Sequence, residues 1–165
     1  MISRIALTAA LAAVALPAIA KDASYIGSVE VIRGDAAADM ARGTVSLDAN
    51  RNSMLDEGES GLEGVIVTNG REVVKTGADG TYELPAYADM NLSVVKAAGY
   101  TTPVDSYMVP QFAYVHKEAG SPDLRFGGIE ATGTLPTAVN FPMIEDDAGT
   151  EFNCLAFGDA QPYSN

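Results

Sequence analysis

The stretch "GVIVTNGREVVKT", residues 64–76, carries the clearest fold signal in the sequence. Two short runs rich in β-branched residues, 64–69 and 71–76, meet at Asn69-Gly70. Two such runs joined by Asn-Gly predict a β-hairpin, because both residues tolerate the positive φ of a type I′ turn. The sequence therefore predicts a pair of neighbouring antiparallel strands here.

Further strand-like runs lie on both sides of this hairpin, with Gly, Asn and Asp where they join. They cover residues 25–32, 43–47, 81–84 and 91–97. No segment from 21 to 118 has a helical period in its apolar residues. Closely spaced short strands of this kind predict an all-β sandwich, which we place at residues 21–118.

Proline and glycine become frequent after residue 103. Proline interrupts β-ladders and glycine frees the backbone, so this region predicts an extended strap with edge strands at 112–116 and 137–144. We assign residues 119–151 as a joining segment. The apolar run that starts at residue 152 then predicts the beginning of a second domain, of which 152–165 is a truncated start.

The first twenty residues have the pattern of a secretory signal peptide. Arg4 supplies the positive charge, residues 5–16 the apolar core, and residues 18–20 a small-x-small cleavage site. The apolar core is too short to span a bilayer comfortably. We therefore expect residues 1–20 to be cleaved, and the protein to be periplasmic or secreted without a membrane contact afterwards.

The charge balance limits the classes of partner that the protein can bind. The chain has 22 acidic and 10 basic residues, a net charge of −12, and one cysteine, Cys154. Such a surface repels nucleic acid and anionic membranes and attracts divalent cations, so we expect no nucleic-acid partner. An intrachain disulfide is excluded, and Cys154 is expected to be a small buried residue of an apolar strand.

Residues 48–59 carry side-chain oxygens at the spacing of a calcium loop. Calcium prefers about six to eight oxygen ligands, which EF-hand loops supply from alternating positions. The candidate ligands are Asp48, Asn50, Asn52, Met54 (through its carbonyl), Asp56 and Glu59. Ser53 stands where such loops have glycine, and a strand rather than a helix precedes the loop. The pattern predicts a weak structural Ca²⁺ site; the alternative is a solvated acidic loop.

The run "GTVSLDANRNSMLDEGESGLEGVIVTNG", residues 43–70, with "TGADGTYEL", residues 76–84, resembles the calcium-loop β-modules of bacterial surface proteins of the Cna-B type. A strand enters an Asp-x-Asn-x-Asn loop, and a Gly-Leu-x-Gly-Val run leaves it. The resemblance implies a Cna-B-like β-sandwich in which the metal holds the loop between two strands; the phosphoesterase resemblance described next implies a transthyretin-like one.

Three later stretches resemble bacterial calcineurin-like metallophosphoesterases with an N-terminal β-domain. They are "AAGYTTPVD" (97–105), "PQFAYVHKEAGSPDLRFGGIEATGTLPTAVNFPMI" (110–144) and "FNCLAFGDAQPYSN" (152–165). The resemblance implies that 152–158 is the first strand of an αββα phosphoesterase domain. It makes Asp159 a metal ligand and puts Gln161, a weaker ligand, where many relatives have histidine. The alternative is that Asp159 is a turn residue after Gly158.

The remaining ligands of that family have no counterpart in this chain, whose one histidine is His116. A lone histidine among strand residues is more often a packing or hydrogen-bonding residue than a ligand. We therefore expect a chain that is inactive by itself, with transition metals bound only if the catalytic domain is present. The expected function is that of an exported, non-catalytic N-terminal module whose partner is its own downstream phosphoesterase domain. The alternative is a self-contained calcium-dependent surface binding or adhesion module that recognises a glycan or surface protein.

Overall fold

The computed structural model describes residues 24–34 and 39–146, and within these ranges the chain forms strands and no helix. No helix that could cross a membrane occurs in this part of the chain. The strands are β1 (Glu30–Ile32), β2 (Met40–Leu47), β3 (Ile66–Thr68), β4 (Val73–Lys75), β5 (Thr81–Pro85), β6 (Asp89–Val94), β7 (Tyr100–Thr101), β8 (Ala113–Lys117) and β9 (Ala138–Glu145). The predicted all-β class is confirmed.

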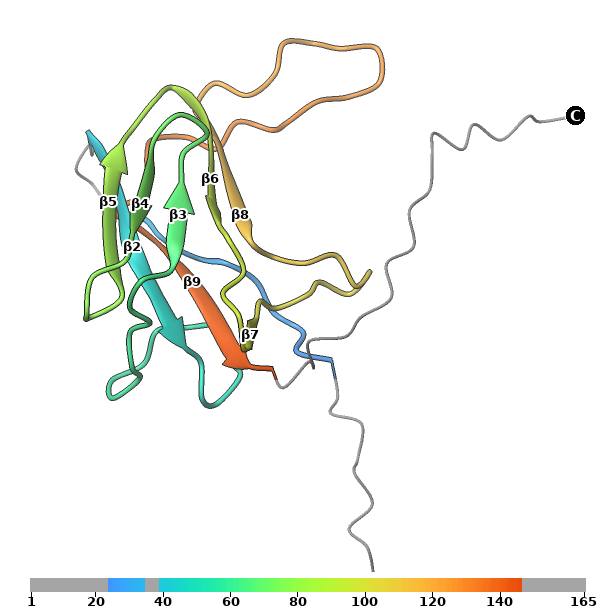
Figure 1. The fold of residues 1–165 in the computed structure, drawn as a ribbon. Helices are drawn as coiled ribbons and strands as arrows, with labels where there is room; N and C mark the ends of the chain where they lie inside the picture. Colours follow the sequence, from blue (N-terminus) through green and yellow to red (C-terminus); the bar gives the residue numbers. More distant parts are fainter. Residues whose placement is uncertain (1–23, 35–38, 147–165) are drawn as a thin grey trace, which may run out of the picture.

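The strands form two sheets (Figure 1). One has the order β1-β9-β2-β5, with β7 also paired to β9, and the other has the order β4-β3-β6-β8. Within the first sheet, β2 and β9 run parallel, whereas the other pairs are antiparallel. The parallel pair brings residues about one hundred positions apart into register, with Val45 opposite Phe141.

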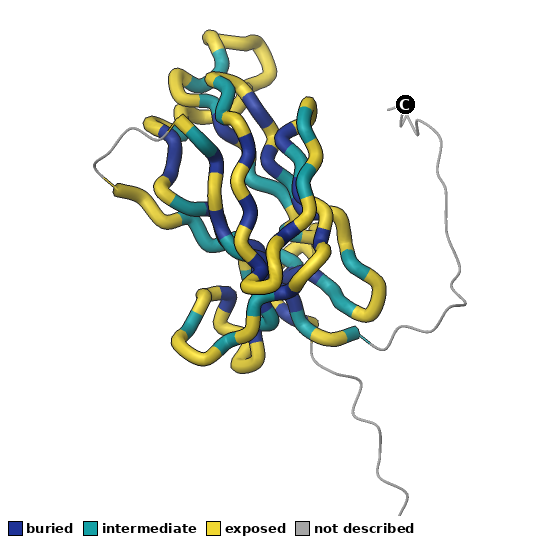
Figure 2. The backbone as a smooth tube through the Cα atoms, turned by 60° about the vertical axis from the view of Figure 1, so that its left-hand side comes forward, coloured by how far each residue is buried: buried dark blue, intermediate teal, exposed yellow. Residues whose placement is uncertain are grey.

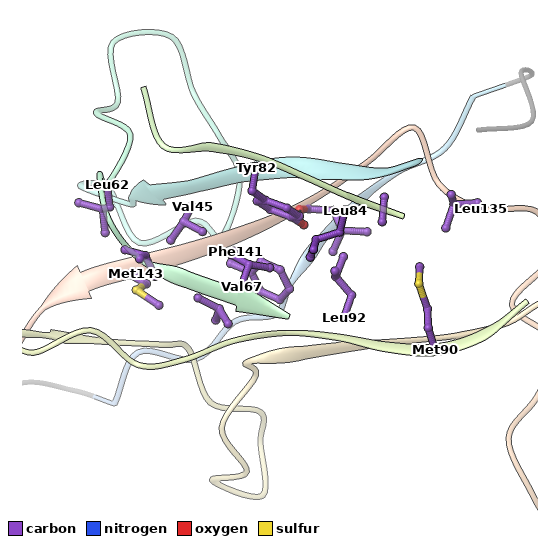
Figure 3. Packing of buried hydrophobic residues seen from close by; sticks show 14 residues of the cluster. Val45, Leu62, Val67, Tyr82, Leu84, Met90, Leu92, Leu135, Phe141 and Met143 are labelled. Atoms are coloured by element: carbon purple, nitrogen blue, oxygen red, sulfur yellow. The ribbon is translucent and has the colours of Figure 1, made fainter. Parts of the chain in front are cut away.

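Both sheets contribute side chains to one hydrophobic core. Burial alternates along β5 and β6, as expected for strands with one face on a core and one in solvent (Figure 2). Phe141 and Leu84 from the first sheet and Leu92 from the second are fully or almost fully buried in the same cluster (Figure 3). The Tyr82 ring packs 6.1 Å from that of Phe141, and its hydroxyl donates to the Val139 carbonyl at 2.6 Å. The Cna-B-like or transthyretin-like type of this arrangement remains a prediction.

The hairpin at residues 64–76 is present, but its predicted turn is wrong. β3 and β4 pair with Thr68 opposite Val73, which leaves four connecting residues rather than two. The Asn69 side chain accepts from the backbone N–H groups of Arg71 at 2.9 Å and Glu72 at 2.7 Å. Gly70 has a positive φ and Asn69 does not. The asparagine therefore stabilises a wider turn through its side chain rather than through its own backbone.

The prediction that 137–144 is an edge strand is also wrong. β9 lies between β1 and β2, and five of its consecutive residues are buried. β1 pairs with β9 as far as Asn140, and β7 resumes the pairing at Ile144. Pro142 falls between these two partners, which is where a residue without an N–H is tolerated in an inner strand. Residues 138–145 of the predicted joining segment thus belong to the first sheet.

Several expectations fall outside the described residues. They are the signal peptide 1–20, the start of a second domain at 152–165, Cys154, and the ligands Asp159 and Gln161.

Candidate functional site

The loop of residues 48–59 leaves β2 directly and is closed at its base by backbone hydrogen bonds. The Leu47 N–H donates to the Ser60 carbonyl at 2.8 Å, and Ser46 forms a β-bridge with Gly61. The Asp48 N–H donates to the Met143 carbonyl at 2.8 Å. The first candidate ligand is therefore anchored to the central strand β9.

Asp48 is a fully buried carboxylate at the base of the loop. Its oxygens accept from the backbone N–H groups of Asn52 at 3.1 Å and Ser53 at 2.7 Å. The Tyr25 hydroxyl also donates to this carboxylate. A buried charge is tolerated only with such partners, so Asp48 is fixed by groups from its own loop and from the N-terminal segment.

The side chains of Asn50, Asn52 and Asp56 converge in the exposed part of the loop. Both asparagine Nδ2 atoms lie 2.7 Å from Asp56 Oδ2. The amide oxygens of Asn50 and Asn52 accept from backbone N–H groups two residues further on, at 3.0 and 2.8 Å. The side chains at the third, fifth and ninth positions of the loop thus meet at Asp56 Oδ2, which accepts hydrogen bonds from the amide groups of Asn50 and Asn52.

Glu59 ties the end of the loop to its beginning. Its Oε1 accepts from the Ala49 N–H at 2.9 Å and its Oε2 from the Asp56 N–H at 3.2 Å. The Met54 side chain is exposed, while its N–H donates to Asn52 Oδ1. Both carboxylate oxygens of Glu59, at the twelfth position, therefore accept hydrogen bonds from backbone N–H groups of the loop.

Two residues of the loop adopt the left-handed conformation without being glycine. Arg51 has a φ of 61° and Ser53 a φ of 62°. Ser53 occupies the position where glycine is usual, and it is buried with its hydroxyl accepting from the Ser28 N–H at 3.3 Å. A serine in this conformation is strained, because its Cβ approaches the backbone in a way that glycine avoids.

The sequence reasoning missed two residues that hold the loop from outside. Tyr25 donates to Asp48, and Glu30 Oε2 accepts from the Leu55 N–H at 3.1 Å and from Asn140 Nδ2 at 2.7 Å. Burial, followed by the hydrogen bond to Asp48, raises the pKa of Tyr25. Both residues lie more than twenty positions before their loop partners, so no local pattern reveals them.

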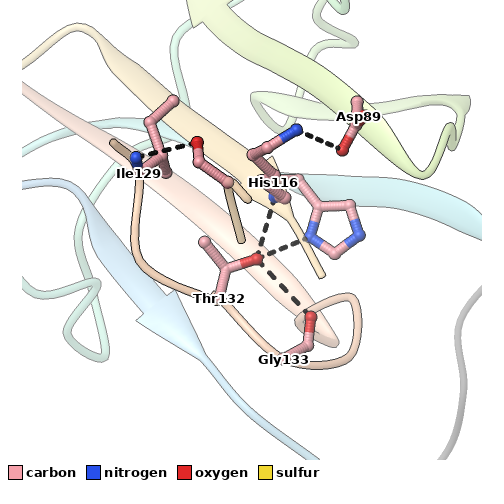
Figure 4. Close-up of polar contacts among 7 residues, drawn as sticks. Asp89, His116, Ile129, Thr132 and Gly133 are labelled. Atoms are coloured by element: carbon pink, nitrogen blue, oxygen red, sulfur yellow. Dashed lines mark hydrogen bonds and ion pairs between the residues drawn. The ribbon is translucent and has the colours of Figure 1, made fainter. Parts of the chain in front are cut away.

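His116 is a hydrogen-bonding and packing residue, as predicted. It is buried on β8, its Nδ1 lies 3.3 Å from Thr132 Oγ1, and its ring stacks on Tyr114 (Figure 4). The Thr132 hydroxyl oxygen also accepts from the Lys117 N–H at 2.9 Å. Burial lowers the pKa of His116, which favours the neutral imidazole.

The donor set of the loop suits a hard cation, since it consists of carboxylate and amide oxygens. Within residues 24–34 and 39–146, however, no three histidine, cysteine or acidic side chains are grouped at metal-binding distance. The described arrangement is a loop closed by internal hydrogen bonds. Of the six candidate ligands, Asn50 and Asn52 contact the carboxylate of a third, Asp56. Asp48 and Glu59 accept hydrogen bonds from backbone N–H groups of the loop.

Residues 49–127 match the family model for the N terminal of calcineurin-like phosphoesterase. The match runs from the second residue of the loop past β8, and so covers all of the loop except Asp48 and all four strands of the four-stranded sheet. It supports the assignment of this region to the N-terminal domain of calcineurin-like phosphoesterases. No curated protein matches the chain.

Proposed function

We propose that this chain is the exported, non-catalytic N-terminal module of a calcineurin-like metallophosphoesterase, with a structural Ca²⁺ site in residues 48–59. The match of residues 49–127 to the N-terminal domain of that family carries the proposal. In this role the two-sheet domain supplies no hydrolytic group. The reaction belongs to the domain that we expect to begin at residue 152.

The calcium part of the proposal rests on the convergence at Asp56. The two amide groups that now face its carboxylate occupy the positions where a cation would be attracted. Asp48 and Glu59 supply two further carboxylates at the two ends of the loop. A bound Ca²⁺ would join these ends through oxygen atoms and so stabilise the loop in the folded chain.

The phosphoesterase assignment is tested on the gene and on the protein. We expect the reading frame to continue past Asn165 and to encode a Gly-Asn-His-Glu motif. The longer protein, loaded with Mn²⁺, should hydrolyse bis(p-nitrophenyl) phosphate, and the 165-residue chain should not. A stop codon directly after Asn165, with no phosphoesterase gene nearby, would favour the adhesion-module alternative.

Export predicts a defined mature N-terminus. After expression with the complete leader in a Gram-negative host, N-terminal sequencing should give Lys21 as the first residue. The protein should then appear in the periplasmic or extracellular fraction. Recovery of the uncleaved chain in the cytoplasm would contradict this part of the proposal and leave the domain assignment intact.

Calcium binding is tested by thermal unfolding of the 165-residue chain. At about a hundred times its dissociation constant, a ligand specific for the folded state stabilises it by about 2.7 kcal/mol, which raises Tm by several degrees. Magnesium should do much less, because it requires a tight octahedron and loses its waters reluctantly.

Glu59→Gln should abolish the calcium-dependent shift, because it weakens a bidentate carboxylate. Glu57→Gln is the matched control, since it makes the same change at an exposed position of the same loop. Asp79→Ala, outside the loop, is a second control. Equal shifts with Ca²⁺ and Mg²⁺ that survive Glu59→Gln would remove the metal site from the proposal.

A further inference from the structure

The N-terminal segment, residues 25–30, runs beside the first half of the loop 48–59 and in the same direction. Three residues of the segment, spread over its whole length, form hydrogen bonds with three residues of the loop. The pairs are Tyr25 with Asp48, Ser28 with Ser53, and Glu30 with Leu55. The loop is therefore supported from outside along this side and not at one point only.

Gly27 allows the close packing between the segment and the loop. A Cβ at this position would clash with the Ser53 hydroxyl and would lie 3.2 Å from the Pro103 Cβ. The Gly27 N–H donates to the Val104 carbonyl at 3.0 Å, and the Val104 N–H donates to the Tyr25 carbonyl at 2.8 Å. The segment thus lies between the loop on one side and residues 103–104 on the other.

The contacts of the segment are largely separate from the two-sheet core. β1, which ends the segment and continues to Ile32, is a three-residue strand at the edge of the first sheet, paired with β9. Tyr25 is buried outside the hydrophobic cluster between the sheets, and Val29 packs against that cluster while only partly buried. An element with few core contacts can open while the rest of the domain stays folded.

We propose that the N-terminal segment and the loop 48–59 open and close as one unit. If the segment alone moved away, the buried Asp48 would lose its Tyr25 donor and the Leu55 N–H would lose its acceptor. If the loop alone opened, the Tyr25 hydroxyl would be left without its acceptor. A buried polar group without a partner costs free energy, so both half-open states are disfavoured relative to joint opening.

A cation bound in the loop would then also hold the N-terminal segment, although the segment contains none of the six candidate ligands. Coupling between two sites is reciprocal, so closure of the segment favours binding as much as binding favours closure. This calcium linkage rests on the proposed function, whereas the joint opening does not. The two parts are therefore measured separately.

Amide hydrogen exchange, followed by NMR in the 165-residue chain without calcium, tests the joint opening. The Ser53 N–H reports on the loop, the Gly27 N–H on the side of the segment that faces away from the loop, and the Val94 N–H on the core; each donates one hydrogen bond. Ser53 and Gly27 should have the same protection, and Val94 a higher one. Unequal protection of Ser53 and Gly27, or equal protection of all three, would overturn the proposal.

Asn50→Ala perturbs the loop without changing the segment, because the Asn50 side chain forms its hydrogen bonds with residues of the loop. The exchange of the Ser53 and Gly27 N–H groups should accelerate by the same factor, about fivefold for the loss of hydrogen bonds at an exposed site. An unchanged rate at Gly27 would overturn the joint opening.

Leu92→Val is the control for unfolding of the whole domain. Leu92 is fully buried in the core, so its replacement should accelerate exchange of the Val94 N–H. Gly27 and Ser53 should keep their rates, because the opening of the segment and loop leaves the core intact. Equal acceleration of all three would mean that the segment opens only with the whole domain, which would overturn the proposal.

The calcium linkage is tested by the same exchange measurement. At about a hundred times its dissociation constant, Ca²⁺ should slow exchange at Gly27 and at Ser53 by the same factor, about a hundredfold, and Mg²⁺ should do much less. Protection of Ser53 without Gly27 would overturn the inference and leave the calcium site of the proposed function intact. No effect of Ca²⁺ at either position would overturn the linkage together with that calcium site, while equal protection of the two without calcium would still support the joint opening.

Discussion

The loop 48–59 and the turn 105–109 are both organised by an aspartate that accepts backbone N–H groups. Asp48 accepts from residues four and five positions further on, and Asp105 from residues two and four positions further on. Asp48 is fully buried and has Tyr25 as a third donor, whereas Asp105 is partly exposed. The loop directs its polar side chains towards one another, and the turn directs apolar side chains outward.

The difference shows how one local device supports two kinds of surface. An aspartate that caps backbone donors fixes a loop without a helix or strand. In the loop, the fixed backbone brings carboxylate and amide groups together, which suits a cation. In the turn, the fixed backbone leaves the side chains of Tyr107, Met108 and Val109 exposed to solvent. Burial of the aspartate decides how much stability depends on it.

The largest expected effect is the loss of the buried aspartate. Asp48→Ala leaves two buried donors, the Tyr25 hydroxyl and the Ser53 N–H, without their acceptor and should lower the free energy of unfolding by about 3–5 kcal/mol. Asp105→Ala, where water replaces the carboxylate, should cost about 1 kcal/mol. Urea unfolding of both variants without calcium measures the difference. Similar losses for the two would mean that burial does not distinguish these aspartates.

The two regions also differ in how far the sequence alone predicts them, because local patterns are visible in the sequence and contacts between distant residues are not. The hairpin at 64–76 and the spacing of the oxygens in 48–59 are local patterns, and the strands appear near the expected residues. The inner position of β9 could not be predicted in this way. Pro142 and the frequent glycines of this region are typical of edge strands, and the parallel pairing of β9 with β2 joins residues that are far apart in the sequence. The contacts of Tyr25 and Glu30 with the loop are equally non-local. The exposure of Tyr107, Met108 and Val109 depends on the backbone geometry of the turn, which composition does not encode.

Removal of the third donor to Asp48 tests the role of the N-terminal segment. Tyr25→Phe deletes the hydroxyl and should cost about 1–2 kcal/mol in urea unfolding. Burial and the Asp48 hydrogen bond raise the pKa of Tyr25, so its contribution is present below a pH of about 10 and is lost as pH rises further. Tyr25→Phe should therefore reduce the alkaline loss of stability. An unchanged pH profile would show that Tyr25 is not the group that titrates.

A smaller effect separates the strained residues of the two regions. Met108 in the turn has a φ of 65° and Ser53 in the loop a φ of 62°. Met108→Gly should stabilise the protein by about 0.5–1 kcal/mol, because glycine adopts this conformation without a Cβ clash. Ser53→Gly should change little, since the same relief is offset by the lost acceptor for the Ser28 N–H. Thermal unfolding measures both. An equal gain for the two would mean that the Ser53 hydroxyl contributes nothing.

The smallest expected effect lies in a third segment, which provides a control for both aspartate-centred regions. His116 is buried next to Thr132, and burial lowers its pKa below the ordinary value of 6.5. Asp89 and Glu118 act in the opposite direction and Arg33 in the same one, and burial outweighs the two acids. A lowered pKa means that the unfolded chain binds the proton more readily, so this contribution is complete above pH 6.5 and declines as pH falls through the folded pKa.

His116→Gln should therefore flatten the decrease in Tm between pH 7 and a pH of about 5, the range in which an unperturbed histidine titrates. Asp105→Ala is the matched control and should keep the slope of the unmodified chain, at a lower Tm throughout. A slope that persists in His116→Gln and disappears in Asp105→Ala would assign the titration to the turn instead.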